Sequence, residues 1–223
     1  TVTMRLIPAV RARFTSTSSV SLGEKRCVCA SIRPLRPGAG TGVGRRFFLA
    51  MHAIVILAAM LIRPAGLADV PAMTETLNWA IAHTDVIFRA TPASIAERED
   101  YLRELWEKDC PCLVAESDSG DYLGWALYHP YRDPQVWTGC YETTIYLSPT
   151  AQGQGVGTAL LGALVKAARA DKKVHSLLAL IVSTNAASLK LHEKFGFENV
   201  GILKEVCYKF DRWLSLTHLQ LLV

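Results

Sequence analysis

Three glycines at alternate positions, Gly153, Gly155 and Gly157, lie within the segment SPTAQGQGVGTALLGALVKAARA of residues 148–170. The residues that follow them carry apolar side chains at helical spacing, and an extended run, CYETTIYL at residues 140–147, precedes them. The segment therefore predicts a strand, a bare turn and a helix in succession. Unpaired backbone N–H groups at a helix N-terminus bind anions such as a pyrophosphate, and the absence of a Cβ allows close approach.

The spacing separates this turn from two common phosphate-binding loops. Thr158 follows Gly157 where a G-x-x-x-x-G-K-[ST] loop needs a lysine. Leu160 stands where the dinucleotide loop G-x-G-x-x-G needs a third small residue. What remains, Gln152-x-x-Gly155-x-Gly157, predicts a diphosphate cradle without lysine or metal. On the glycines alone, a flexible turn remains the alternative.

The rest of the chain predicts an α+β fold. Strands are expected at residues 60–64, 112–116, 122–130, 140–147 and 177–182, with one or two more from residue 202. Helices are expected at 69–79 with Asp69 as cap, from a Ser94-x-x-Glu97 capping box, after the glycines, and at 186–195. The order β-α-α-β-β-β-α-β-α-β-β gives an α+β or mixed-sheet fold without repeats.

The charges divide the 223-residue chain into two parts. Residues 1–59 hold nine Lys and Arg against one Glu, whereas residues 60–223 hold 15 basic against 19 acidic side chains. The first part is rich in Arg, Ser, Pro and Gly, which predicts a disordered or targeting leader before a single domain at 60–223. The basic pI of 8.8 comes mainly from this leader and says little about the domain. We therefore expect no nucleic-acid partner.

An apolar run of 16 residues, Phe47–Ile62, follows Arg45 and Arg46. A membrane span needs about 20 residues, so we expect no stable span. A signal sequence, an organelle transit peptide and an upstream translated tail ahead of Met60 all remain open for the leader.

Six cysteines include two C-x-C pairs, Cys27/Cys29 and Cys110/Cys112. Neither pair has the C-x-x-C spacing or the nearby histidines of a zinc site, so we expect no metal. Free thiols in a reducing compartment are expected, namely the cytoplasm or, if the leader is a transit peptide, a mitochondrial or other organelle matrix.

Three motifs in order carry a resemblance to a known superfamily: Gln152-x-x-Gly155-x-Gly157, Asn185-x-x-Ser188 and Phe195-Gly196-Phe197. They resemble the GNAT superfamily of N-acetyltransferases. YETTIYLSP, NAASLKLHEKFGF and YKFDRWLSLTHLQLL are similar to its phosphinothricin and methionine-sulfoximine N-acetyltransferase family. Over residues 60–223 the resemblance implies a mixed, largely antiparallel twisted sheet flanked by helices. It places the acetyl-CoA pyrophosphate loop between the fourth strand and the next helix, and it implies a homodimer.

The resemblance also implies the residues that hold acetyl-CoA as co-substrate. These are Leu147, Gln152, Gly153, Gln154, Gly155, Val156, Gly157, Thr158, Asn185 and Ser188. Backbone N–H groups around Leu147 would polarise the thioester carbonyl. Asn185 would hydrogen-bond the pantetheine arm.

Acetyl transfer to an amine requires a proton acceptor, because an ammonium with a pKa near 10 costs about 4 kcal/mol to deprotonate at pH 7. By resemblance Glu142, in the family's E-x-[ST]-[VI]-Y strand, is this general base; a solvated strand carboxylate is the alternative. His192 stands where many superfamily members have a tyrosine that protonates the departing thiolate. It is expected to face the substrate or transfer a proton, and a satisfied helical histidine is the alternative.

Arg132 and Lys209 match basic family positions near the small-molecule amine substrate, although exposed surface charge is the alternative for both. Arginine's paired donors suit a carboxylate or phosphinate. Arg89 in IFRATPAS replaces an acidic family stretch, which leaves the acceptor open. Trp125 and Trp213 are expected in the core.

The leading hypothesis is an acetyl-CoA-dependent N-acetyltransferase for a small amino acid or analogue, acting by direct transfer with a glutamate base. A different amine, such as a polyamine or a peptide N-terminus, is one alternative. A sensor that binds acetyl-CoA without turnover is another.

Overall fold

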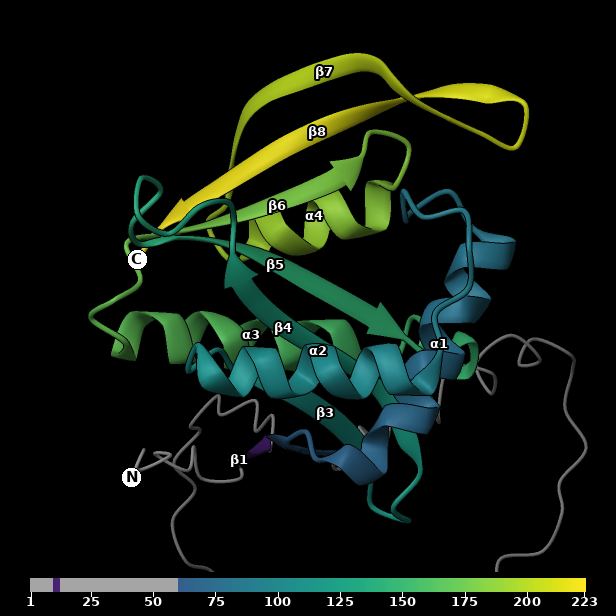
Figure 1. The fold of residues 1–223 in the computed structure, drawn as a ribbon, viewed down its shortest axis with the longest axis vertical. Coiled ribbons are helices and arrows are strands. Elements are labelled where there is room, and N and C mark those ends of the chain that lie inside the picture. Colours follow the sequence, from purple (N-terminus) through teal and green to yellow (C-terminus); the bar gives the residue numbers. More distant parts are fainter. Residues whose placement is uncertain (1–9, 13–59) are drawn as a thin grey trace, which may run out of the picture. The chain divides into compact units, whose positions relative to one another are not determined.

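The computed structural model describes residues 10–12 and 60–223. These residues form one sheet of eight strands in the order β1-β2-β3-β4-β5-β6-β8-β7, flanked by four helices (Figure 1). Every neighbouring pair is antiparallel except β5 and β6. The expected α+β fold with a largely antiparallel sheet is confirmed.

The strands are β1 (Val10–Ala12), β2 (Met60–Pro64), β3 (Cys112–Ser117), β4 (Tyr122–Pro130), β5 (Cys140–Leu147), β6 (Ser176–Val182), β7 (Glu198–Lys209) and β8 (Arg212–Leu222). The helices are α1 (Val70–His83), α2 (Ile95–Glu107), α3 (Val156–Ala170) and α4 (Ala186–Lys194), with two 3-10 turns, η1 (Leu67–Asp69) and η2 (Pro149–Ala151). β1 lies inside the segment expected to be a leader and pairs with β2. The glycine turn therefore follows the fourth strand from Met60, which is the fifth strand among the described residues.

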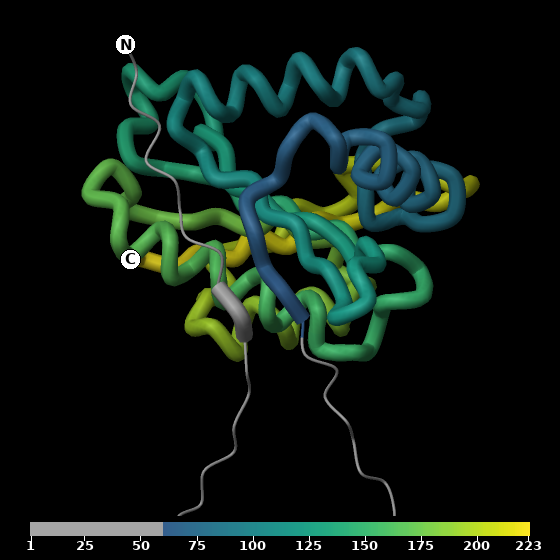
Figure 2. Tube along the Cα trace, turned by 90° about the horizontal axis from the view of Figure 1, so that it is seen from below, coloured from purple at the N-terminus to yellow at the C-terminus, as the bar shows by residue number. Residues whose placement is uncertain are grey.

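Two layers of helices cover the two faces of the sheet, and the two views agree on this arrangement (Figure 2). α3 packs Leu160, Leu161 and Leu164 against one face, where they meet Tyr128 and Leu177 of the strands. α1 and α2 pack against the opposite face over Val114, Trp125 and Leu127 of β3 and β4. Each strand in the centre thus buries alternate side chains in two separate cores.

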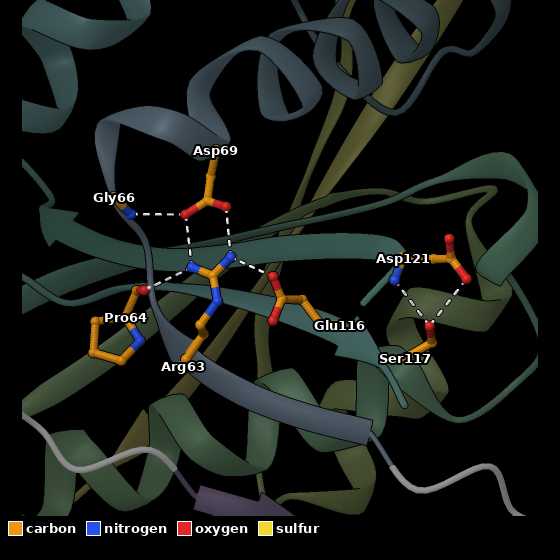
Figure 3. Close-up of polar contacts among 7 residues, drawn as sticks. All are labelled: Arg63, Pro64, Gly66, Asp69, Glu116, Ser117 and Asp121. Carbon is orange, nitrogen blue, oxygen red and sulfur yellow. Dashed lines mark hydrogen bonds and ion pairs between the residues drawn. The ribbon is translucent and has the colours of Figure 1, made fainter. Parts of the chain in front are cut away.

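Arg63 joins the end of β2 to the start of α1 and to β3 (Figure 3). Its guanidinium donates to the two carboxylate oxygens of Asp69 at 2.7 and 2.6 Å and also pairs with Glu116. Asp69 accepts the Gly66 N–H at 2.8 Å. Burial raises the pKa of Asp69, but the hydrogen bonds from Arg63 and Gly66 outweigh it and hold the pKa below its usual value.

The expected cap on α1 is corrected by these contacts. Asp69 stands at the N-cap position, but its side chain makes no capping bond to α1 because Arg63 and Gly66 occupy its oxygens. The helix extends beyond the expected end at Trp79, to His83.

The expected capping box on α2 is half formed. Ser94 Oγ accepts the Glu97 N–H at 3.2 Å, as expected. The Glu97 carboxylate instead accepts two hydrogen bonds from Arg89, at 2.6 and 2.9 Å. The arginine that departs from the family pattern therefore holds the α1–α2 loop onto α2.

The two tryptophans expected in the core differ in burial. Trp125 is 2% exposed, as expected, whereas Trp213 is 60% exposed and that expectation was wrong. β8 pairs with β6 only from Leu216 onward, so Trp213 lies on the part of the β7–β8 hairpin that extends beyond the sheet. Among residues 60–223, no helix is both long and apolar enough to cross a membrane.

Candidate active site

β5 and β6 pair in parallel for three residues and then separate. Cys140, Tyr141 and Glu142 are paired with residues 176–178, and no pair follows Glu142. Thr143 Oγ1 donates to the Leu178 carbonyl at 3.1 Å and closes the vertex of this divergence. Beyond the vertex lies a cavity lined by residues 143–146 of β5, residues 179–182 of β6, Val86, Asn185, Ser188 and His192.

The glycine turn lies at the other end of β5, between η2 and α3. Gly153 and Gly155 have φ of +75° and +82°, and nothing lies within 4 Å of a Cβ built on either. Gly155 is the N-cap residue of α3 and makes no side-chain cap, so the first N–H groups of this helix have no partner within the helix. The turn therefore fits a pyrophosphate, since a side chain at either glycine would enter the space in front of these donors.

Gly157 also has a packing role. It lies in the first turn of α3 and is buried. A Cβ there would come within 3.2 Å of Leu191 on α4 and 3.6 Å of Leu147 on β5. Its missing side chain therefore lets α3 pack closely against α4 and β5.

The other residues expected in the pyrophosphate loop differ in exposure. Gln152 and Gln154 are exposed, and Gln154 Nε2 donates to the Thr150 carbonyl at 2.6 Å. Val156 is 1% exposed and belongs to the core under α3, so only its backbone faces the turn. Thr158 is partly exposed in the first turn of α3.

Leu147 ends β5 beside the glycine turn, five residues beyond Glu142. At about 3.3 Å per residue this is roughly 16 Å along the strand. The N–H of Leu147 therefore lies at the end of β5 next to the glycine turn.

Asn185 and Ser188 form the start of α4. Asn185 Oδ1 accepts the Ser188 N–H at 3.1 Å and caps the helix. Asn185 lines the cavity, and its amide N–H₂ makes no hydrogen bond among the described residues. Both residues thus line the cavity.

His192 lines the cavity but is only 4% exposed. Its Nδ1 lies 2.9 Å from the Ser188 carbonyl, which can only accept, so Nδ1 carries the hydrogen and Nε2 the lone pair. The ring meets Phe197 edge-on at 5.0 Å. Burial lowers the pKa of His192 despite the Ser188 bond, so the ring is neutral at pH 7 and suits accepting a hydrogen bond better than protonating a thiolate.

Glu142 occupies the vertex and lies on the face of the sheet covered by α1 and α2. It is paired directly across β4 with His129. Burial raises the pKa of Glu142, while the charges of His129 and His218 oppose this shift. A carboxylate with a raised pKa is a stronger proton acceptor near neutral pH than an exposed one.

The two expected substrate cations are far apart. Arg132 follows β4 at the Glu142 end of the sheet, whereas Lys209 pairs with Arg212 at the tip of the β7–β8 hairpin. Leu221 of β8 pairs with Leu177 of β6, which is at the Glu142 end of the sheet. Arg212 is nine residues before Leu221 on the same strand, so it lies about 30 Å from that end. Lys209 Nζ donates instead to the carbonyls of Thr84 and Ile87 at 2.7 and 3.1 Å. Within one chain the two cations cannot contact the same small substrate.

Arg132 is exposed and stacked between two aromatic rings. Its guanidinium carbon lies 5.1 Å from the centre of the Tyr131 ring and 5.3 Å from that of Trp137. The planar donors are thereby held in place near the vertex without an ion-pair partner among residues 60–223.

No group of His, Cys, Asp and Glu in the described part of the chain could hold a metal ion. Cys110, Cys112, Cys140 and Cys207 are free thiols.

The glycine cradle, the cavity between diverging strands and the carboxylate at its vertex can now be compared with known proteins. The family model described as "Acetyltransferase (GNAT) family" matches residues 81–197. The chain belongs to the GNAT family of acetyltransferases. The expected enzyme class, an N-acetyltransferase, is confirmed.

Relatives of this acetyltransferase are named for small amino-acid analogues. An L-methionine sulfoximine/L-methionine sulfone acetyltransferase of Pseudomonas paraeruginosa is 39% identical over 160 residues, which are 72% of this chain and 92% of that protein. A phosphinothricin N-acetyltransferase of Streptomyces coelicolor is 34% identical over 155 residues, 68% of this chain and 90% of that protein.

Solved structures extend the comparison to the cofactor. An acetyltransferase of Salmonella typhimurium, solved with its cofactor acetyl-CoA, has a TM-score of 0.71 and 35% identity over 73% of this chain and 93% of its own. A phosphinothricin acetyltransferase of Sinorhizobium meliloti in complex with acetyl-CoA has a TM-score of 0.70 and 30% identity over 73% and 87%. These structures support acetyl-CoA as the co-substrate of this acetyltransferase.

Sequence reasoning missed His129, His218 and Val86, which the fold brings to the cavity or to Glu142. No motif marks them. Only the register of β4 with β5, and of β6 with β8, places the two histidines on the same face as the carboxylate.

Gly155→Val should weaken acetyl-CoA binding at least tenfold, because the new side chain enters the space in front of the α3 N–H groups. Isothermal titration calorimetry measures the Kd. Gly120→Val is the matched control, since Gly120 has φ of +85°, equally open space, and a place in the distant β3–β4 turn. An unchanged Kd for Gly155→Val, or an equal loss in both variants, would contradict the cradle.

Proposed function

We propose that this acetyltransferase transfers the acetyl group of acetyl-CoA to the amino group of a small amino acid or analogue, of the methionine sulfoximine or phosphinothricin kind. The observation that carries this proposal is the divergence of β5 and β6, which opens a cavity directly beyond the partly buried carboxylate of Glu142. The glycine turn follows the far end of the same strand. The names of the relatives support the substrate class. Arg89 pairs with Glu97 rather than facing this cavity, so its departure from the family leaves this substrate class in place.

Acetyl-CoA supplies its acetyl group as a thioester. The turn from Gln152 to Thr158 holds its pyrophosphate through backbone N–H groups, and Asn185 with Ser188 contacts its pantetheine arm. The backbone of β5 beyond Glu142 donates to the thioester carbonyl, which gains negative charge as the amine attacks.

Glu142 is the proposed general base. Its carboxylate takes a proton from the acceptor ammonium, directly or through a water, and so makes the nitrogen lone pair available. His192, neutral at pH 7, accepts a hydrogen bond from the acceptor or from a water in the cavity. Arg132 reads the acid group of the acceptor from the adjacent loop through its paired donors.

Glu142→Gln should lower kcat/KM at pH 7 by about 10² to 10⁴, because the amide keeps the shape but cannot take a proton. The deficit should shrink as the pH rises toward the pKa of the acceptor amine, where less help is needed. A thiol-release assay measures the rate and calorimetry checks that acetyl-CoA still binds. Glu198→Gln, an exposed strand carboxylate on β7, is the control. A Glu142→Gln enzyme within threefold of wild type would exclude this residue as the base.

Arg132→Ala should raise KM about tenfold for amines that carry a carboxylate or phosphinate, and should spare polyamines and acetyl-CoA. Arg132→Lys should recover part of the loss, because lysine keeps the charge without the paired donors. Arg169→Ala, an exposed arginine of α3, is the control. Equal losses for all amines would argue against recognition of the acid group.

We also propose a homodimer. A second copy would cover the large apolar side chains that the β7–β8 hairpin leaves about half exposed or more: Val200, Ile202, Leu203, Val206, Tyr208, Phe210 and Trp213. Light scattering should therefore give the mass of two chains at micromolar concentration, and Trp213→Ser should shift it toward one. A wild-type mass of one chain would contradict the dimer.

The free thiols support the cytoplasm, or an organelle matrix, as the place of action. Recovery of the active protein from the secreted fraction of its cells would contradict this.

A further inference from the structure

Glu142 is flanked by two histidines on one face of the sheet. His129 is its direct partner on β4, and Leu178 on β6 is its partner on the other side. His218 is paired with Leu180, two residues further along β6, so its side chain lies on this same face. The carboxylate thus has an imidazole on each side. His129 is on the neighbouring strand, whereas β6 lies between Glu142 and His218.

His129 is the nearer of the two and is held in a defined orientation. Directly opposite residues on antiparallel strands have Cβ atoms about 4.5–5.5 Å apart, so the imidazole and the carboxylate are neighbours. His129 Nδ1 lies 2.9 Å from the Pro130 carbonyl. Because a carbonyl can only accept, Nδ1 carries the hydrogen and Nε2 keeps a lone pair that can take a proton. Tyr101 of α2 meets the ring edge-on at 6.5 Å and limits its rotation.

The other titratable or charged groups around His129 and Glu142 leave the role of proton acceptor to His129. Tyr101 of α2 contacts His129, and the charges of Arg98, Cys110 and Cys112 act on Tyr101. Glu142 of β5 is paired with His129, and His218 of β8 acts on Glu142. Burial raises the pKa of Tyr101 to about 12 and that of Cys110 to about 11, so both stay protonated at neutral pH. Arg98 keeps its proton as well. His129 is also partly exposed, which gives it a route to water that the cavity-lining His192 lacks.

We propose that His129 is the second proton acceptor of this site, taking from Glu142 the proton that the acceptor ammonium has released and passing it to water. The inference rests on the proposed role of Glu142. The proton moves from the ammonium nitrogen to a Glu142 oxygen and then to His129 Nε2, which restores the carboxylate and forms an imidazolium. The Nε2 proton then leaves to solvent, and Nδ1 keeps its hydrogen and its hydrogen bond to the Pro130 carbonyl throughout. No other reactant is required.

The test compares His129→Phe with His218→Phe, since phenylalanine keeps a flat ring but has no proton site. Both histidines lower the pKa of Glu142 through their charge, so each variant should move the acid limb of the pH profile of kcat/KM to higher pH. Only His129→Phe should also lower kcat about tenfold on the plateau above that limb. Added imidazole, as an external proton acceptor, should restore most of this loss in His129→Phe and none in His218→Phe.

A second readout needs no turnover. In the free enzyme with ¹³C-labelled glutamate carboxylates, NMR should show Glu142 titrating at higher pH in His129→Phe than in wild type. The control His83→Phe should leave that titration unchanged, because His83 bonds a backbone carbonyl and stacks on Trp79 at the end of α1.

The outcomes separate this inference from the proposed function. A plateau kcat of His129→Phe equal to wild type, or a loss that imidazole does not restore, would overturn the relay while Glu142→Gln still shows its large deficit. An unmoved Glu142 titration would overturn the electrostatic contact itself. A Glu142→Gln enzyme with near wild-type activity would instead remove the base on which the relay depends.

Discussion

The site depends on the early end of the parallel ladder between β5 and β6. Each strand is paired along its length on its outer side, β5 with β4 and β6 with β8, so both stay in the sheet after they separate. Beyond Glu142 the backbone groups that face inward have no strand partner. Buried backbone polar groups need hydrogen bonds, and Thr143 supplies one at the vertex. The remaining groups line a slot in which an extended, amide-containing coenzyme arm can complete the ladder.

The glycines illustrate how one motif serves two physical purposes. Gly153 and Gly155 adopt positive φ and leave open space in front of the α3 N-terminus, which suits an anion. Gly157 brings α3 close to Leu191 of α4, whose helix carries His192. The anion cradle and the wall of the cavity are therefore connected through the packing of α3 on α4, and a change at one glycine need not resemble a change at another.

Burial acts in opposite directions on the two titratable groups at the cavity. It disfavours charge in both, so it raises the pKa of Glu142 and lowers that of His192. The carboxylate becomes a better proton acceptor and the imidazole stays neutral. His129 and His218, on either side of Glu142, moderate the first effect, which keeps the carboxylate ionised over more of the neutral range.

The sequence by itself determined the element order, the glycine turn and the family, because these follow from local periodicity and from residues close together in the chain. It also placed Glu142 and His192 correctly on a strand and a helix that reach one cavity. Only the tertiary structure decided that Lys209 donates to the carbonyls of Thr84 and Ile87. It also decided that Asp69 pairs with Arg63 instead of capping α1, and that Trp213 is exposed. The same holds for the histidines beside Glu142, since strand register and the reach of a hairpin are set by pairing between distant segments, which no local pattern encodes.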